Sequence, residues 1–312
     1  MTTPQITVQR VDAEDLPVVP RRHLGRWAAA AVIVAVAAVF LQSVITNSRF
    51  GWTTVGQYLG QVSILNGLLN TLLLTVSCMA IGIILGIVLA IMRQSANPIL
   101  RGAAFAYTSF FRGTPVLVQI LFWFNLAALY PVISFGIPGV SLDANALITP
   151  FAAAILGLGL NEAAYMAEIV RAGIIAVDGG QNEAGAALGM TKFQTMYRVI
   201  LPQAMRVIIP PTGNEFIGLL KTSSLVSVIA VPDLLYSSQI IYSRNFQTIP
   251  LLIVASIWYL LATTILSTGQ FYIERHFARG TKNMPMTPLQ QIRHFFRTHA
   301  KPLAPVTDRK KK

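Results

Sequence analysis

Long runs of apolar residues, separated by short polar segments, dominate the chain from about residue 27 onward. A stretch of about 20 predominantly apolar residues is long enough to cross the hydrocarbon core of a bilayer as an α-helix. Six stretches reach or approach that length, and they cover residues 27–45, 64–92, 107–130, 149–175, 207–230 and 249–273. The pattern therefore predicts an all-α, polytopic membrane protein with six transmembrane helices.

Composition agrees with this interpretation, because 54% of the 312 residues are hydrophobic and only 12% are charged. The first apolar run follows Arg21 and Arg22, as the apolar core of a secretion signal would. No small-residue cleavage site follows the run, so we interpret it as a retained helix. The single cysteine, Cys78, lies inside an apolar span and excludes an internal disulfide.

The distribution of basic residues predicts the orientation of the helices. Lysine and arginine in short loops stay on the cytoplasmic side of a membrane. With a cytoplasmic N-terminus, 21 of the 24 lysines and arginines lie in cytoplasmic segments, Arg112 among them, and only Arg49 and Arg244 lie outside. Both termini are therefore predicted to be cytoplasmic. The net charge of +12 is explained by this asymmetry and by contact with anionic lipid, rather than by nucleic-acid binding.

The cytoplasmic loop 176–206 carries the signals of two short helices. Asn182 is a candidate N-cap for a helix over 183–188, and Gly189 permits the left-handed turn that would end it. Thr191 and Gln194 have capping-box spacing, which predicts a second helix over 192–200, limited by Pro202. These signals leave two interpretations open: a loop packed on its neighbours, or a docking surface for a soluble partner.

The residues of this loop are spaced as in a loop of a known protein family. Glu183-Ala184-Gly185 is followed by three residues and Gly189, then by nine residues and Val199-Ile200-Leu201-Pro202. The stretch resembles the EAA loop of permease subunits of ATP-binding-cassette (ABC) importers, with the pattern Glu-Ala-Ala, three residues, Gly, nine residues, Ile-x-Leu-Pro. Gly185 replaces the third alanine and Val199 the isoleucine. Glycine inside a short helix costs about 1 kcal/mol relative to alanine.

Five segments in order resemble the polar amino-acid branch of these importers, the relatives of histidine and glutamine permeases. They read NGLLNTLLLT, FFRGTPVLVQ, AAYMAEIVRAGI, GQNEAGAALG and LLKTSSLVSVI. The branch often has Asp or Asn after the lysine that matches Lys221, where this chain has Thr222, which leaves the substrate type more open. The resemblance implies a five-helix type I importer core at 64–275, an extra N-terminal helix with an external loop at 27–63, and cytoplasmic tails at 1–26 and 276–312.

The resemblance also implies the function: a permease subunit in the bacterial plasma membrane that forms the pathway for a polar amino acid. The sequence has no phosphate-binding loop of its own, since GLLKTS at Gly218 lacks the second glycine. The implied partners are two cytoplasmic ATPase subunits that bind ATP and Mg²⁺, a second identical or different permease subunit, and an extracellular solute-binding protein. No cofactor is expected on this chain itself. The residues expected to contact the ATPase are Glu183, Ala184, Ala187, Leu188, Gly189 and Pro202.

Polar side chains inside the spans are candidates for the substrate pathway, because they are costly to place in a membrane. Glu162 lies about half-way along the fourth span, where its carboxylate can bind an ammonium group or simply accept a hydrogen bond from a neighbouring helix. The full set of candidates is Thr114, Gln119, Asn161, Glu162, Asn214 and Lys221.

Four features near these candidates have structural interpretations. At the entrance of the third span, Arg112-Gly113-Thr114-Pro115 breaks the regularity of the helix. Glu168 and Arg171 are spaced to form an ion pair, and Pro210-Pro211 is predicted to kink or delay the fifth helix. Gly82 and Gly86 suit close helix packing.

Three other classes of protein explain the sequence less well. An ion-coupled secondary transporter is typically built from internal repeats with more intramembrane charge. A membrane enzyme needs a catalytic constellation, yet the four histidines all lie outside the predicted spans. A membrane scaffold leaves the spacing of the 183–202 stretch without an explanation.

Overall fold

The computed structural model describes residues 24–134 and 141–277. These residues are almost entirely helical, apart from a two-stranded antiparallel ribbon in which β1 (Val132–Ile133) pairs with β2 (Leu142–Asp143). The chain divides into two compact units at residue 52. The predicted tails 1–26 and 276–312 lie almost entirely outside the described residues.

The first unit consists of α1 (Leu24–Thr46) and a short 3₁₀ turn, η2 (Ser48–Phe50). The side chain of Asn47 accepts a hydrogen bond from the Arg49 amide at 3.0 Å and caps η2. Alanine, valine and isoleucine fill α1, and none of the side chains in its most apolar window is buried. The helix coincides with the first predicted span.

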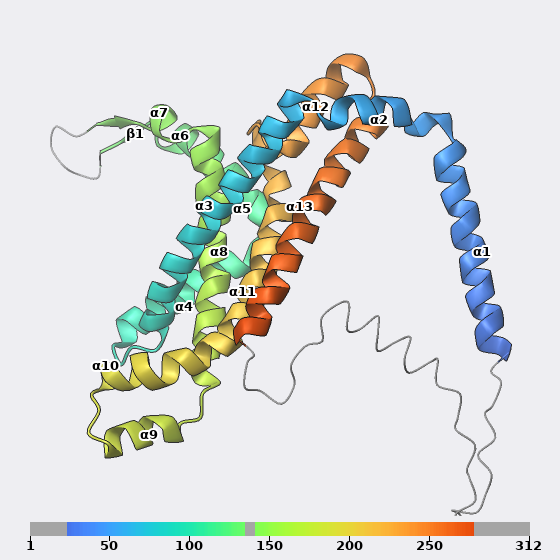
Figure 1. Cartoon of the computed structure of the whole chain (residues 1–312). Helices are drawn as coiled ribbons and strands as arrows, with labels where there is room; N and C mark the ends of the chain where they lie inside the picture. Colours follow the sequence, from blue (N-terminus) through green and yellow to red (C-terminus); the bar gives the residue numbers. More distant parts are fainter. Residues whose placement is uncertain (1–23, 135–140, 278–312) are drawn as a thin grey trace, which may run out of the picture. The chain divides into compact units, whose positions relative to one another are not determined.

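The second unit holds the remaining helices. In chain order they are α2 (Trp52–Leu59), α3 (Val62–Arg93), α4 (Pro98–Gly113), α5 (Val116–Phe124), α6 (Leu126–Leu129), α7 (Ala144–Leu147), α8 (Pro150–Ile175), α9 (Gly180–Ala187), α10 (Lys192–Thr195), η3 (Met196–Ile200), α11 (Leu201–Thr222), η4 (Ser223–Ile229), α12 (Leu234–Asn245) and α13 (Thr248–Phe277). Within this unit α3, α8, α11 and α13 run lengthwise, with α9 and α10 at one end and α2, α7 and α12 at the other (Figure 1).

Close packing of α3 on α8 forms the centre of the second unit. Gly82 faces Glu162 and Gly86 faces Met166, and a Cβ added to Gly86 would lie 2.5 Å from the Cβ of Met166. The two glycines, one turn apart, thus let the helix backbones approach, as the sequence suggested. The main cluster of buried apolar side chains lies around this contact and includes Leu74, Cys78, Ile120, Leu158 and Val226.

The third predicted span, 107–130, is not one continuous helix, and its first break lies within the segment 112–115, where the sequence indicated an irregularity. The chain leaves the helix at Thr114, whose φ and ψ of −116° and 145° are extended, and α5 begins after Pro115. Proline lacks an amide donor and disfavours the helical conformation of the residue before it, so Pro115 separates α4 from α5. Arg112 consequently lies in the last turn of α4, beside this break.

The expectation that Pro210-Pro211 delays the fifth helix is also wrong. Helix α11 begins at Leu201 and continues through both prolines to Thr222. Gln270 of α13 donates a hydrogen bond to the Pro210 carbonyl at 3.1 Å. The helical path ends only after η4, at Ala230, which has a positive φ of 60°.

Several of the described helices have the length and composition needed to cross a membrane. Four qualify singly: Gly25–Thr46, Val62–Arg93, Pro150–Ile175 and Thr248–Phe277. The path Lys192–Ile229 with Leu234–Asn245, bent by 44°, makes a fifth if it is counted as one span. The predicted third span is divided among α4, α5 and α6, and the count of six stays a prediction.

The contact at Gly86 makes the helix packing testable. Gly86→Ala would place a methyl group against backbone atoms of Met166 and Ala167. We expect this overpacking to lower the free energy of unfolding by about 1–3 kcal/mol. Gly102→Ala in α4, where nothing lies within 4 Å, should be neutral or stabilising by up to about 1 kcal/mol. The check is thermal unfolding of both purified variants in detergent, and equal midpoints would contradict the packing described.

Candidate functional site: the EAA loop and a polar pocket

The loop 176–206, here called the EAA loop, begins with α9. The predicted cap at Asn182 is wrong, because α9 begins two residues earlier, at Gly180. The Asp178 carboxylate accepts a hydrogen bond from the Gly180 amide at 2.7 Å. One of the free amides at the start of the helix is therefore satisfied by a residue that the sequence analysis did not consider.

The end of α9 follows the prediction at Gly189. This residue has a φ of +70°, and its amide donates to the Ala186 carbonyl at 3.0 Å. The Met190 amide donates to the Gly185 carbonyl, also at 3.0 Å. This pair of bonds is a Schellman motif, in which the left-handed residue is usually glycine.

The capping box that starts the second helix is confirmed, but its predicted end is wrong. The Gln194 amide donates to Thr191 Oγ1 at 3.3 Å, and the Thr191 amide donates to Gln194 Oε1 at 2.9 Å. Beyond α10 the chain makes a π-helical turn, η3, in which the Leu201 amide bonds to the Met196 carbonyl five residues back. The wider turn lets the helix continue past Pro202 into α11.

Gly185, the departure from the Glu-Ala-Ala pattern, has a packing reason. It is buried, and a Cβ at this position would lie 2.6 Å from Oγ1 and 2.7 Å from Cγ2 of Thr195, which is also buried. Alanine would improve helix propensity, but it would separate α9 from α10. Glycine at 185 and threonine at 195 are therefore complementary in size.

The surface of the EAA loop exposes the residues that were expected to contact a partner. Glu183, Ala184, Ala187, Gly189 and Pro202 are exposed, and Leu188 is 80% exposed. Sequence analysis missed Phe193 and Tyr197, which are 77% and 64% exposed with stacked rings 6.3 Å apart. Their signal was two aromatic residues four apart, the spacing of neighbours on one helix face.

A polar pocket of about 350 Å³ lies where the α4–α5 break meets α8 and α11. Three predicted pathway residues, Thr114, Asn161 and Glu162, line it, whereas Gln119, Asn214 and Lys221 do not. The complete lining is Thr114, Pro115, Val116, Leu158, Asn161, Glu162, Tyr165, Glu215, Gly218, Leu219 and Thr222.

Two side-chain amides hold the α4–α5 break against α8. Gln119 is buried and its Nε2 lies 3.0 Å from the Phe111 carbonyl and 2.7 Å from Thr114 Oγ1. Asn161 donates to the same Phe111 carbonyl at 2.7 Å and to Gln119 Oε1 at 3.2 Å. These bonds satisfy carbonyls that the end of a helix leaves free. Gln119 thus supports the wall of the pocket from behind.

Glu162 is the most unusual group in the pocket. Its side chain is 5% exposed, and among the described residues its Oε1 is a buried atom without a hydrogen-bond partner. Gly82 of α3 makes room for it, since a Cβ there would lie 2.6 Å from Glu162 Cγ. A buried carboxylate oxygen without a partner is costly, which makes this atom a candidate to bind a ligand.

Sequence analysis missed a second acidic residue of the pocket, Glu215. It lies on α11, three residues before Gly218 and seven before Thr222, and all three line the pocket. The signal was present, because an acidic residue in an apolar span is a functional candidate. The sequence candidates in the fifth span are Asn214 and Lys221. Each of them is adjacent in the sequence to a residue that lines the pocket, Glu215 or Thr222.

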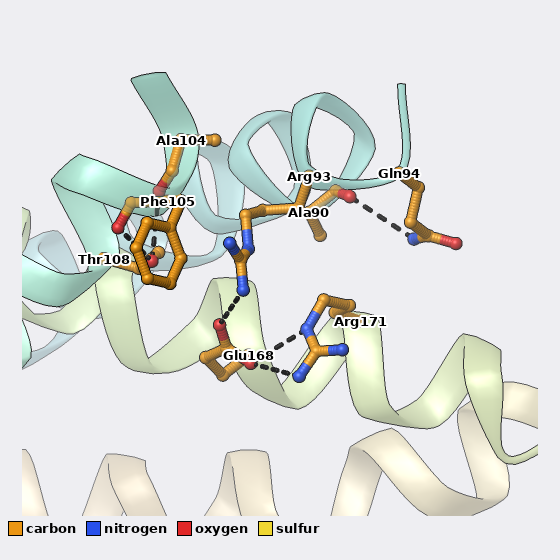
Figure 2. Close-up of polar contacts among 8 residues, drawn as sticks. All are labelled: Ala90, Arg93, Gln94, Ala104, Phe105, Thr108, Glu168 and Arg171. Carbon is orange, nitrogen blue, oxygen red and sulfur yellow. Dashed lines mark hydrogen bonds and ion pairs between the residues drawn. The ribbon is translucent and has the colours of Figure 1, made fainter. Parts of the chain in front are cut away.

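A cluster of charged side chains ties α8 to α3 near the EAA loop (Figure 2). Glu168 accepts hydrogen bonds from Nε and Nη2 of Arg171 at 2.9 and 2.7 Å, which confirms the predicted pair. Arg93 of α3 adds a longer contact to Glu168, at 3.4 Å, and its guanidinium lies 4.8 Å from the centroid of the Phe105 ring on α4. Glu168 thus joins α8 to α3, and Arg93 extends the cluster to α4.

The arrangement contains no candidate metal centre: within residues 24–134 and 141–277, no three His, Cys, Asp or Glu side chains are grouped to hold an ion.

Apolar helices long enough to span a bilayer, a buried polar pocket and an exposed helical loop at one end define a membrane transport subunit. Residues 82–279 match the family described as the binding-protein-dependent transport system inner membrane component, and the chain belongs to that family.

Curated relatives support the same assignment. The chain is 51% identical over 264 residues to the arginine transport system permease protein ArgU of Corynebacterium glutamicum, which covers 84% of this chain and 83% of that protein. It is 37% identical over 240 residues to the L-cystine transport system permease protein TcyB of Bacillus subtilis, and the match covers 77% of this chain and 96% of that protein. The chain is the translocation subunit of an ABC importer.

Solved structures agree in fold. A crystal structure of an amino acid ABC transporter with histidines superposes with a TM-score of 0.59 at 40% identity, covering 69% of this chain and 94% of that one. An inward-facing structure of the MetNI methionine ABC transporter superposes with a TM-score of 0.54 at 19% identity, covering 70% of this chain and 97% of that one. At this identity the likeness shows only that the fold is shared.

The fit of Gly185 to Thr195 predicts a compensating pair of substitutions. Gly185→Ala alone should loosen α9 from α10 and speed amide hydrogen exchange in the EAA loop, because overpacking costs about 1–3 kcal/mol. Adding Thr195→Ala removes both overlapping atoms and should restore slow exchange. Hydrogen-exchange mass spectrometry of the two variants and of Thr195→Ala alone is the measurement. A double variant that exchanges as fast as Gly185→Ala would contradict this packing.

Proposed function

We propose that this permease subunit carries a cationic amino acid through the bacterial plasma membrane, and that the pocket around Glu162 is a station on its pathway. The observation that carries the proposal is the unpartnered Oε1 of Glu162, buried in a pocket that also contains Glu215. Two carboxylates attract an ammonium or guanidinium group. The similarity to a relative named for arginine transport supports a basic substrate over other polar amino acids.

The other candidate residues have supporting parts in this proposal. Thr114 and Asn161 provide polar contacts in the pocket, and Gln119 holds the α4–α5 break in place. The guanidinium of Arg112 lies 5.4 Å from the ring centroid of Tyr165, another lining residue. Asn214 accepts a hydrogen bond from Gln270 at 3.2 Å and is exposed, as is Lys221. We place these last two on the pathway beside the pocket.

We further propose the assembly around the chain. Two ATPase subunits bind ATP and Mg²⁺, a second permease subunit completes the pathway, and a solute-binding protein delivers the amino acid. The EAA loop docks on one ATPase through Glu183, Ala184, Ala187, Leu188, Gly189 and Pro202, with Phe193 and Tyr197 adding apolar area. Closure of the ATPases would then move the loop and α11 as a rigid body between inward- and outward-facing states.

The proposed topology has six spans and both termini in the cytoplasm. Residues 64–275 form the importer core, 27–63 an additional helix and its external loop, and 1–26 and 276–312 the cytoplasmic tails. The asymmetric distribution of lysine and arginine supports this orientation.

Substitution of Glu162 tests the pocket. Glu162→Gln keeps the size of the side chain but removes its charge, and a hydrogen bond to a charged group contributes about 1.5–3 kcal/mol. We expect arginine transport at saturating binding protein to fall by about tenfold or more, with neutral amino acids less affected and ATPase co-purification unchanged. Reconstituted vesicles provide the measurement, with Asp143→Asn as the control for charge outside the pocket, because Asp143 is exposed and does not line it. Full arginine transport by Glu162→Gln would exclude this role.

The left-handed turn after α9 tests the coupling role. Gly189→Ala forces a side chain into a conformation that costs about 1–2 kcal/mol, although nothing lies within 4 Å of the added Cβ. We expect the permease to insert normally, while less ATPase co-purifies and transport per ATP hydrolysed falls. Gly179→Ala is a matched control in the same loop, since its surroundings are equally open and its φ is −59°. Equal coupling in the two variants would refute the assignment of this loop.

A further inference from the structure

A second cavity, larger than the pocket, lies between α3, α8 and α11 and has no part in the proposed pathway. Its volume is about 640 Å³ and its lining is almost wholly apolar. Ile83, Ile87 and Ile91 form one wall on α3, and Val170 and Met205 contribute from α8 and α11. Ile87 and Ile91 are 42% and 62% exposed, so the cavity is an open groove on the surface of the unit.

The groove follows the polar pocket along α8 and α11. On α8 the pocket ends at Tyr165, and the groove begins one residue later, at Met166. On α11 the groove ends at Thr212, and the pocket begins at Glu215. The two cavities have no lining residue in common, so the groove is a separate site beside the pocket.

The dimensions of the groove match one leaflet of a bilayer. Its α3 wall runs from Ile83 to Gln94, which is about 16 Å at the rise of an α-helix. Half of a hydrocarbon core about 30 Å thick is close to that length. The lining is apolar except for Thr212, whose hydroxyl donates to the Ile208 carbonyl at 2.8 Å, and for Gln94 and Ser95 at the end near the EAA loop. An apolar slot with one polar end fits an amphiphile that enters from the membrane surface.

The charge beside the polar end favours an anion. Arg206 directly follows the lining residue Met205, and Arg198 lies three residues before the lining residue Leu201. Both arginines are exposed, and no acidic residue occurs between 184 and 214. Basic residues at the membrane surface attract anionic lipid by about 1 kcal/mol each.

We propose that this groove binds an acyl chain of an anionic phospholipid from the leaflet on the EAA-loop side, with its headgroup held by Arg206 and Arg198. The lipid lies between the α3–α8 core and the segment that joins the EAA loop to α11, since Met196 of η3 and Leu201 also line the groove. It fills space that protein atoms leave open at this joint. A bound lipid therefore stiffens the connection through which the loop moves the core.

Photolabelling of the intact importer complex in nanodiscs tests the lipid site. The probe is phosphatidylglycerol with a diazirine on one acyl chain, and labelled residues are mapped by mass spectrometry. We expect labels to concentrate on groove residues and to fall by about tenfold in Ile87→Trp, whose indole fills the slot. Ile84→Trp is the matched control, because Ile84 is on the same helix, 63% exposed and outside the groove lining. It should label the groove like the unmodified complex.

Competition and charge separate a specific site from bulk lipid. Unlabelled phosphatidylglycerol should compete for the groove better than phosphatidylcholine, and Arg206→Gln should reduce labelling by about fivefold. Labels spread evenly over all membrane-facing residues, or equal competition by both lipids, would overturn the proposal. So would a disulfide between two permease copies formed through Ile87→Cys on a Cys78→Ser background, because a second subunit would then cover the groove.

Discussion

The close approach of α3 to α8 is the constraint on which the functional parts of the core depend. Gly82 and Gly86 present no side chains to α8, and the space they leave is filled by Glu162 and Met166. The first of these residues lines the polar pocket and the second lines the apolar groove. Since larger residues at either glycine would push the backbones apart, both cavities owe their shape to the same helix contact.

Two carboxylates on α8, six residues apart, show how environment assigns different roles to one residue type. Glu168 is held by Arg171 and Arg93 and so joins helices. Glu162 is more deeply buried and has one oxygen without a protein partner. A buried charge is tolerated only when something compensates for it. Under the proposed function the passing substrate supplies that compensation, so the site is strained when empty and relieved when occupied.

Much of this molecule follows from its sequence, and the misses have physical causes. Apolar runs predicted most long helices, and the spacing of the EAA loop identified the family. The break at Thr114-Pro115 could be predicted from the proline, but hydropathy alone placed it inside a span, because hydropathy ignores the missing proline amide. Glu215 was missed because helical spacing does not decide which of two adjacent polar residues, Asn214 or Glu215, faces a pocket between helices. The fit of Gly185 to Thr195 joins two helices, and such a contact is absent from any single-segment pattern.

The π-helical turn η3 rotates the residues that precede it about the helix axis, relative to α11. A turn closed over five residues holds one residue more than an α-helical turn, and each residue advances the helix by about 100°. Phe193 is therefore rotated by about that angle from where periodicity counted back from Ile208 would place it. The direction in which the EAA loop points relative to α11 depends on this one surplus residue. A single deletion between 197 and 199 would change the direction of the loop while leaving the sequence of α11 and of the buried Ile200 unchanged.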